Sequence, residues 1–132
     1  MTTGYAQHVL RTAGIEFRGC TFEVTSRGND NRLSLLTMLV NTNDAFTGLD
    51  SLHLKGQGGT YYAGAYDAGS EFNDQFGANI PGPCVGCGDM GMNGTATNDP
   101  IAGHPGIFDG GALTIAIHGW SDPVAKIVIE RV

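Results

Sequence analysis

The chain contains few charged residues, and few of those are positive. Charged residues make up 15% of the 132 residues, and 7 Lys or Arg stand against 13 Asp or Glu, which gives a formal net charge of −6. This balance would repel a phosphate backbone, so it argues against a nucleic-acid partner. The excess carboxylates are better suited to binding cations or to keeping the chain soluble.

Long hydrophobic runs and long amphipathic helices are also missing. No apolar stretch approaches the roughly 18 residues of a membrane span, so we expect no transmembrane segment. The first residues lack the basic and then apolar pattern of a signal peptide. The many glycines follow no Gly-X-Y period, which excludes a collagen-like chain.

Glycine is what the chain has in excess, with 21 of 132 residues. Glycines between short apolar runs indicate turns between many short strands. A chain of this length forms one domain, so we expect a single domain over residues 1–132. The predicted fold is all-β, an antiparallel β-sandwich with long Gly/Pro-rich loops. The strand candidates cover residues 15–25, 32–40, 52–54, 60–65, 113–118 and 124–131.

Two of these segments carry further expectations. Residues 32–40 are almost continuously apolar, which is typical of a strand covered on both faces or of a short buried helix, and the flanking Asn and Asp residues favour the strand. In residues 124–131, Lys126 and Glu130 alternate with Ile127 and Ile129, so one face of that strand should be buried. Residues 67–75 are compatible with a helical turn, and residues 77–106 read as a long loop.

Three acidic residues are candidates for a cation site. Asp44 directly follows the apolar run, and Asp67 and Glu71 are four residues apart, so one helical turn would place both carboxylates on the same side. Calcium takes six to eight oxygen ligands from carboxylates, carbonyls and water, which loops readily supply. Acids that cap turns on a solvated surface would give the same spacing, so the spacing alone leaves both interpretations open.

The cysteines and histidines raise a second possibility. Cys84 and Cys87 form a Cys-x-x-Cys pair in a Gly/Pro-rich loop, which favours a local disulfide. The same pair would be half of a zinc site if His104 or His118 completed it, although a second regularly spaced pair is missing. No Gly-x-Ser-x-Gly motif is present, and we expect no enzymatic activity.

Four aromatic residues are candidates for a recognition surface. Tyr61, Tyr62, Tyr66 and Trp120 would form either an aromatic recognition patch or the wet edge of a core, and the sequence does not separate the two.

Six short segments, in order along the chain, resemble the spondin N-terminal domain family. They are NRLSLLTMLV (31–40), TNDAF (42–46), YYAGAYDAGSE (61–71), IPGP (80–83), HPGI (104–107) and PVAKIVIERV (123–132). The resemblance implies an antiparallel β-sandwich that binds one Ca²⁺ ion through loop carboxylates. Position by position, the implied ligands are Asp44, Asp67 and Glu71, with glutamate where the family has aspartate.

The resemblance also implies a place of action and a kind of partner. The family consists of secreted or cell-surface modules for adhesion, so we expect a non-enzymatic interaction module or a subunit of a surface assembly. The resemblance extends from about residue 13 to the end of the chain. About a dozen residues precede it, fewer than in the family, so the family's first strands are expected to be missing. The exposed edge would then favour a homo-oligomer or a strand donated by a partner, with residues 1–12 as a candidate strand in cis or in trans. Alternatively, these residues fold back and close the sheet locally, which would leave a monomeric sandwich. The alternative function is a metal-dependent hydrolase or redox protein that uses Cys84, Cys87, His104 and His118.

Overall fold

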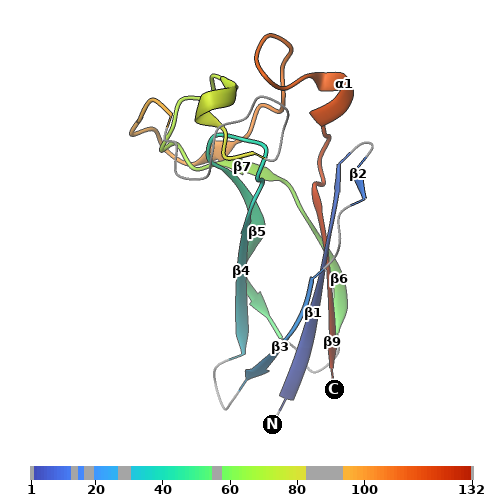
Figure 1. The fold of residues 1–132 in the computed structure, drawn as a ribbon. Helices are drawn as coiled ribbons and strands as arrows, with labels where there is room; N and C mark the ends of the chain where they lie inside the picture. The colour runs from blue at the N-terminus through green and yellow to red at the C-terminus, as the bar shows by residue number, and fades with distance from the viewer. Residues whose placement is uncertain are drawn as a thin grey trace.

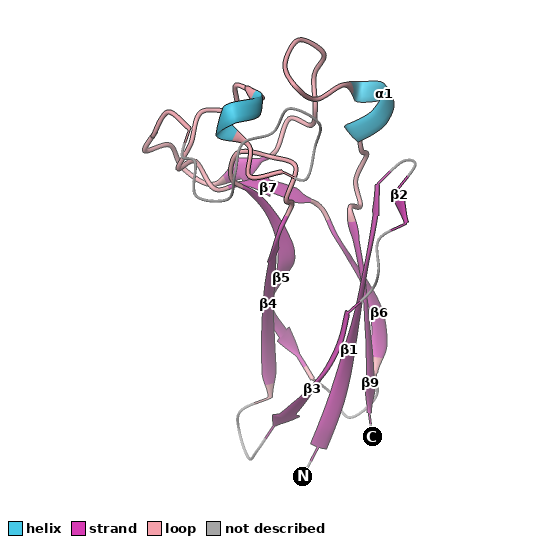
Figure 2. Ribbon diagram, in the orientation of Figure 1, coloured by secondary structure: helices cyan, strands magenta, loops and turns pink. Residues whose placement is uncertain are grey.

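The computed structural model describes residues 2–12, 15–16, 20–26, 31–54, 58–82 and 94–131, which form two antiparallel sheets (Figure 1). The first sheet contains β1 (Thr2–Thr12), β2 (Ile15–Glu16), β3 (Cys20–Ser26), β6 (Gly59–Ala63) and β9 (Ala125–Arg131). The second contains β4 (Arg32–Met38), β5 (Ala45–His53), β7 (Ala65–Asp67) and β8 (Ala102–Gly103). Two short helices, η1 (Gly77–Asn79) and α1 (Ile115–His118), lie among the loops (Figure 2). The all-β prediction is confirmed.

The N-terminal segment takes a place inside its own sheet. β1 pairs with β9 along one edge, from Gly4 opposite Arg131 to Leu10 opposite Ala125, and with β3 along the other. Residues 2–12 therefore pair in cis, within their own sheet, which is one of the placements left open for this segment by the sequence. The exposed edge on which we based strand sharing is thus not formed beside β9, and the homo-oligomer stays a prediction.

The hydrophobic core contains side chains from both sheets. Ile127 and Ile129 of β9 are buried, and they contact a set of partly buried residues that includes Leu33 and Leu35 of β4 and Leu49 of β5. The burial along β9 confirms the predicted alternation, because Lys126 and Glu130 are exposed. This shared cluster supports the predicted sandwich, in which two sheets pack face to face.

One glycine carries the chain from the first sheet to the second. β6 ends at Ala63 and β7 begins at Ala65, so Gly64 alone spans the change of sheet. The fully buried Thr47 donates its hydroxyl to Gly64 O at 2.7 Å, and Asp122 Oδ1 accepts from Ala65 N at 3.0 Å. A Cβ atom at position 64 would lie 2.8 Å from Asp122 Oδ2, so a larger residue there would displace the Asp122 side chain. These contacts tie the crossing point between the sheets to β5 and to the segment that contains Asp122.

The loops on one side of the sheets define a surface that we call the loop end. It comprises residues 39–44, 68–80, 94–101 and 104–124, and it lies away from both chain termini (Figure 1). Ile80 and Leu113 are fully buried within it. No helix in the described part of the chain is long and apolar enough to cross a bilayer.

The expectation that residues 32–40 are covered on both faces is wrong. β4 is an edge strand and its side chains alternate in exposure, with Leu36 at 68% and Met38 at 53%. Leu33 and Leu35 face the core, whereas no described residue covers the opposite face. A run of apolar residues therefore does not establish burial when the strand lies at a sheet edge.

The predicted strand at residues 113–118 is also wrong, because Ile115–His118 form α1. Two side chains fix this turn: Asp109 Oδ1 accepts from Ile115 N at 2.8 Å, and His118 Nδ1 accepts from Thr114 N at 3.1 Å. The alternation of apolar residues resembled a strand, but these side-chain hydrogen bonds favour a helical turn.

Candidate metal centre

Asp44 is the best-anchored carboxylate of the loop end. It lies in the turn between β4 and β5, and its exposed fraction is 5%. Its Oδ2 atom accepts hydrogen bonds from Ser70 N at 2.7 Å, Ser70 Oγ at 2.8 Å and Glu71 N at 2.9 Å. Thr42 holds the same turn, because its hydroxyl donates to Leu39 O and accepts from Ala45 N. Asp44 thus ties two loops together that are 26 residues apart in sequence.

The other carboxylate oxygen of Asp44 is buried without a partner. Asp44 Oδ1 has no hydrogen-bond donor among the described residues, and the same is true of the buried Asn41 Oδ1 in the same turn. A buried carboxylate oxygen without a donor or cation costs free energy. Sequence reasoning missed Asn41, although its position three residues before Asp44 was a signal that oxygen ligands gather in this turn.

Asp67 lies beside Asp44 because β7 pairs with β5, which places Asp67 opposite Ala45. Its Oδ1 atom accepts from Gly69 N at 2.7 Å, and its Oδ2 atom is hydrogen-bonded to Asn73 Nδ2. The predicted helical turn over residues 67–75 is absent. The backbone bends at Gly69, whose φ of +71° is left-handed, and then becomes extended, with Glu71 forming an isolated bridge to Ala96.

Glu71 follows the bend, and its backbone contacts Asp44 as described above. A Cβ atom added at Gly94 would lie 3.1 Å from Glu71 Oε2 and 3.3 Å from Asn43 Nδ2, so these two side chains border the same glycine. Asp67, Glu71 and Asp99 line one cleft of about 240 Å³. The structure therefore brings the three predicted residues into one loop cluster. Among the described residues, however, no three His, Cys, Asp or Glu side chains are arranged to hold a metal ion.

A further carboxylate, Asp74, stabilises this loop cluster, although it is not one of the predicted ligands. Asp74 Oδ1 accepts from Phe76 N at 2.8 Å and Asn43 Nδ2 at 3.2 Å, and Oδ2 accepts from Asn79 Nδ2 at 2.7 Å. Burial raises the pKa of Asp74, but these hydrogen bonds outweigh it and lower the pKa overall. Asp74 therefore holds the Asn43 side chain beside the Asp44 turn.

Each histidine of the alternative site accepts a backbone hydrogen bond at its Nδ1 atom. His104 Nδ1 accepts from Gly106 N at 2.9 Å, and His118 Nδ1 accepts from Thr114 N. Burial lowers the pKa of His104, and the negative charges of Asp67 and Asp44 oppose this shift. Cys84 and Cys87 lie outside the described residues, so the predicted disulfide stays a prediction. Cys20 begins β3, as expected of a strand residue.

Comparison of the chain with protein-family models, with curated proteins and with solved structures found no match. The spondin resemblance therefore rests on the six sequence segments alone.

Proposed function

We propose that the protein is a non-enzymatic interaction module whose loop end binds Ca²⁺ through Asp44, Asp67 and Glu71. One observation carries the calcium proposal. Asp44 is almost fully buried, its Oδ2 atom is saturated by three donors, and its Oδ1 atom has no partner among the described residues. A bound cation would offset the cost of burying this oxygen.

The chemistry of the neighbouring groups also favours calcium. The candidate ligands are all oxygens: the carboxylates of Asp44, Asp67 and Glu71 and the amide oxygen of Asn41. Calcium is a hard cation that accepts such a mixed set, together with backbone carbonyls and water, so three clustered carboxylates are not required. The ion would neutralise part of the negative charge of the loop end and hold its loops in one arrangement.

The biological role is inferred from the resemblance to spondin N-terminal domains. We propose a secreted or cell-surface protein that contacts a protein or matrix partner, either as an adhesion module or as a subunit of a surface assembly. Calcium would then act as a structural ion, because it orders the loops that face the partner. We also propose that copies of the chain associate.

Thermal unfolding with calcium and with EGTA tests the metal proposal. Calcium should stabilise the fold by about 2.7 kcal/mol at a free concentration roughly one hundred times the dissociation constant. Asp67→Asn should remove most of this gain. The matched control is Asp50→Asn, which removes the same charge from an exposed position on β5. If the melting temperatures with calcium and with EGTA coincide, the calcium site is wrong.

Native mass spectrometry of the isolated protein tests the remaining parts. One bound calcium per chain and a mass above that of one chain would support both proposals, whereas a clean mass near 13.8 kDa would argue against association. Zinc in place of calcium would instead support the hydrolase or redox alternative. No contact among the described residues favours that alternative.

A further inference from the structure

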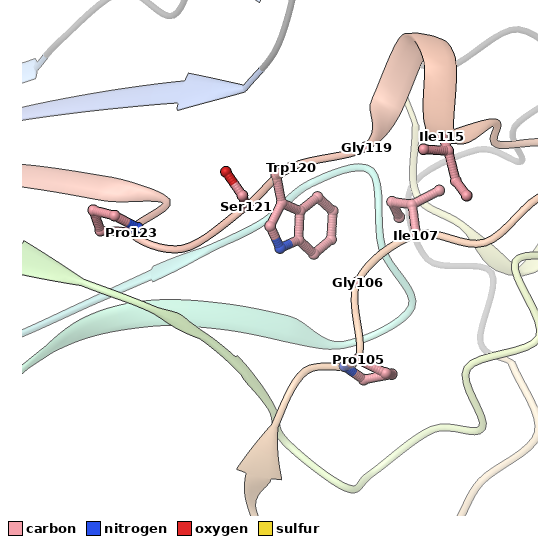
Figure 3. A pocket seen from close by; sticks show the side chains of 8 residues that line it. All are labelled: Pro105, Gly106, Ile107, Ile115, Gly119, Trp120, Ser121 and Pro123. Carbon is pink, nitrogen blue, oxygen red and sulfur yellow. The ribbon is translucent and has the colours of Figure 1, made fainter.

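A second cleft of the loop end is built around the single tryptophan of the chain. It has a volume of about 410 Å³, and Trp120 and Ser121 line it together with two isoleucines, two prolines and two glycines (Figure 3). The glycines, Gly106 and Gly119, carry no side chain that would cover the indole. The volume lies within the range of clefts that take small ligands.

Trp120 is held in place by the residues that pack against it. It packs against the buried cluster of Leu39, Ala45, Ala65 and Val124, and its ring centroid is 5.2 Å from that of His104, with the planes at 43°. The indole is half-buried, so part of it remains accessible from the cleft. A fixed aromatic surface of this kind loses little conformational freedom when a ligand binds to it.

Two carboxylates lie next to lining residues of this cleft, although neither of them lines it. Asp122 lies in the chain between the lining residues Ser121 and Pro123, and it is exposed. Asp109, also exposed, accepts a hydrogen bond from the backbone of the lining residue Ile115. Residues 56–125 contain no lysine or arginine at all. The carboxylate of Asp122 is turned to Ala65 N and that of Asp109 to Ile115 N, so neither acid lines the cleft. Together they give its surroundings a negative charge, which disfavours an anion and favours a cation.

We propose that this cleft binds the cationic side chain of an arginine or lysine carried by a partner polypeptide. A cation over the face of an indole is attracted by the ring quadrupole, and tryptophan is the best of the aromatic residues for this contact. Arginine should bind more tightly than lysine, because its planar guanidinium stacks flat on an aromatic ring. Ser121 is the one residue with a polar side-chain oxygen among those that line the cleft. This inference is independent of the calcium site, because none of its lining residues is a proposed calcium ligand.

Titration of the intrinsic fluorescence tests the proposal directly, because the chain has one tryptophan. The probes are end-capped Gly-Arg-Gly, Gly-Lys-Gly and Gly-citrulline-Gly, of which the last matches the shape of arginine without its charge. The arginine peptide should change the emission of Trp120 in a saturable manner, and added salt should weaken the effect. The citrulline peptide should bind at least about tenfold more weakly. The titration is run in EGTA and repeated with calcium.

Variants locate the binding on the molecule. Asp109→Asn and Asp122→Asn keep the oxygens that accept from Ile115 N and Ala65 N, and each should weaken arginine binding about threefold. Asp50→Asn changes the net charge equally on β5 and should leave binding unchanged. Trp120→Leu, followed by calorimetry, should weaken binding about threefold to tenfold.

Three results would overturn the proposal. The first is equal binding of the arginine and citrulline peptides, and the second is equal weakening by Asp50→Asn and Asp122→Asn. The third is no saturable change of Trp120 emission with any peptide. Because the aspartate variants preserve the local hydrogen bonds, they decide the question even if Trp120→Leu fails to fold.

Discussion

Replacing Asp44 with alanine should destabilise the fold strongly even when calcium is absent. Three hydrogen bonds end on Asp44 Oδ2, at 2.7, 2.8 and 2.9 Å, and two of the donors are backbone groups of another loop. A hydrogen bond to a charged group contributes about 1.5–3 kcal/mol, but bonds that share one acceptor are not additive. The variant also removes the unpartnered Oδ1 atom, which relieves part of the cost of burial. We expect a net loss of about 3–5 kcal/mol.

Such a loss is large for a domain of this size. Small domains are stable by about 5–15 kcal/mol, so the variant would lose about a fifth or more of its free energy of unfolding. Its melting temperature should fall by about 10–20 °C. Asp44→Asn keeps an acceptor oxygen and should lose less, about 1–2 kcal/mol. Asp50→Asn, at an exposed position, should stay within about 0.5 kcal/mol of the parent protein.

Urea unfolding in EGTA, followed by the emission of Trp120, measures all three variants in one assay. The slope of the free energy against urea should not change, because the surface exposed on unfolding stays the same. A loss below about 1 kcal/mol for Asp44→Ala would refute the reasoning, since the three donors would then be satisfied equally well by water. An equal loss for Asp44→Ala and Asp44→Asn would show that the charge, rather than the acceptor, matters.

Two further predictions concern the backbone and the pH dependence. Gly69→Ala should lower the free energy of unfolding by about 1–3 kcal/mol in the same urea assay. The reason is that φ at this position is +71° and the new Cβ atom would lie 2.2 Å from Asp99 O. Gly103→Ala is the control and should cost little, because the space around Gly103 is open. Burial lowers the pKa of His104 below its usual 6.5, so the unfolded chain binds the proton more readily than the folded chain. The folded state should therefore be fully stable above pH 6.5 and lose stability as the pH drops towards the folded pKa. His104→Gln should flatten this slope in urea curves recorded across pH, and an unchanged slope would contradict the assignment.

The fold was more predictable from the sequence than the site was. The alternation of Lys126, Ile127, Ile129 and Glu130 identifies β9 because a period of two is a local property of the chain. By contrast, the exposure of Leu36 depends on where β4 lies in its sheet, which no local pattern records.

The candidate site was only partly predictable for a similar reason. The acidic residues stand out in the sequence, and Asp44 and Asp67 do come together through the pairing of β5 with β7. The burial of Asp44 and its contacts with Ser70 and Glu71 arise from segments 26 or 27 residues away. The spacing of residues along the chain does not predict contacts between such distant segments. It also predicted a helical turn at residues 67–71, where the backbone instead bends at Gly69.

The pairing of β1 with β9 has a practical consequence for how the molecule can be attached to a surface or to another protein. Because Gly4 lies opposite Arg131, both ends of the described chain leave the sheet on the side away from the loop end (Figure 1). β9 has seven residues, so this side is about 20 Å or more from the loops. A bead, a sensor surface or a fused protein joined at either terminus would hold the clefts facing outwards into solution. Tethered copies would therefore be suitable for capturing binding partners without blocking either candidate site.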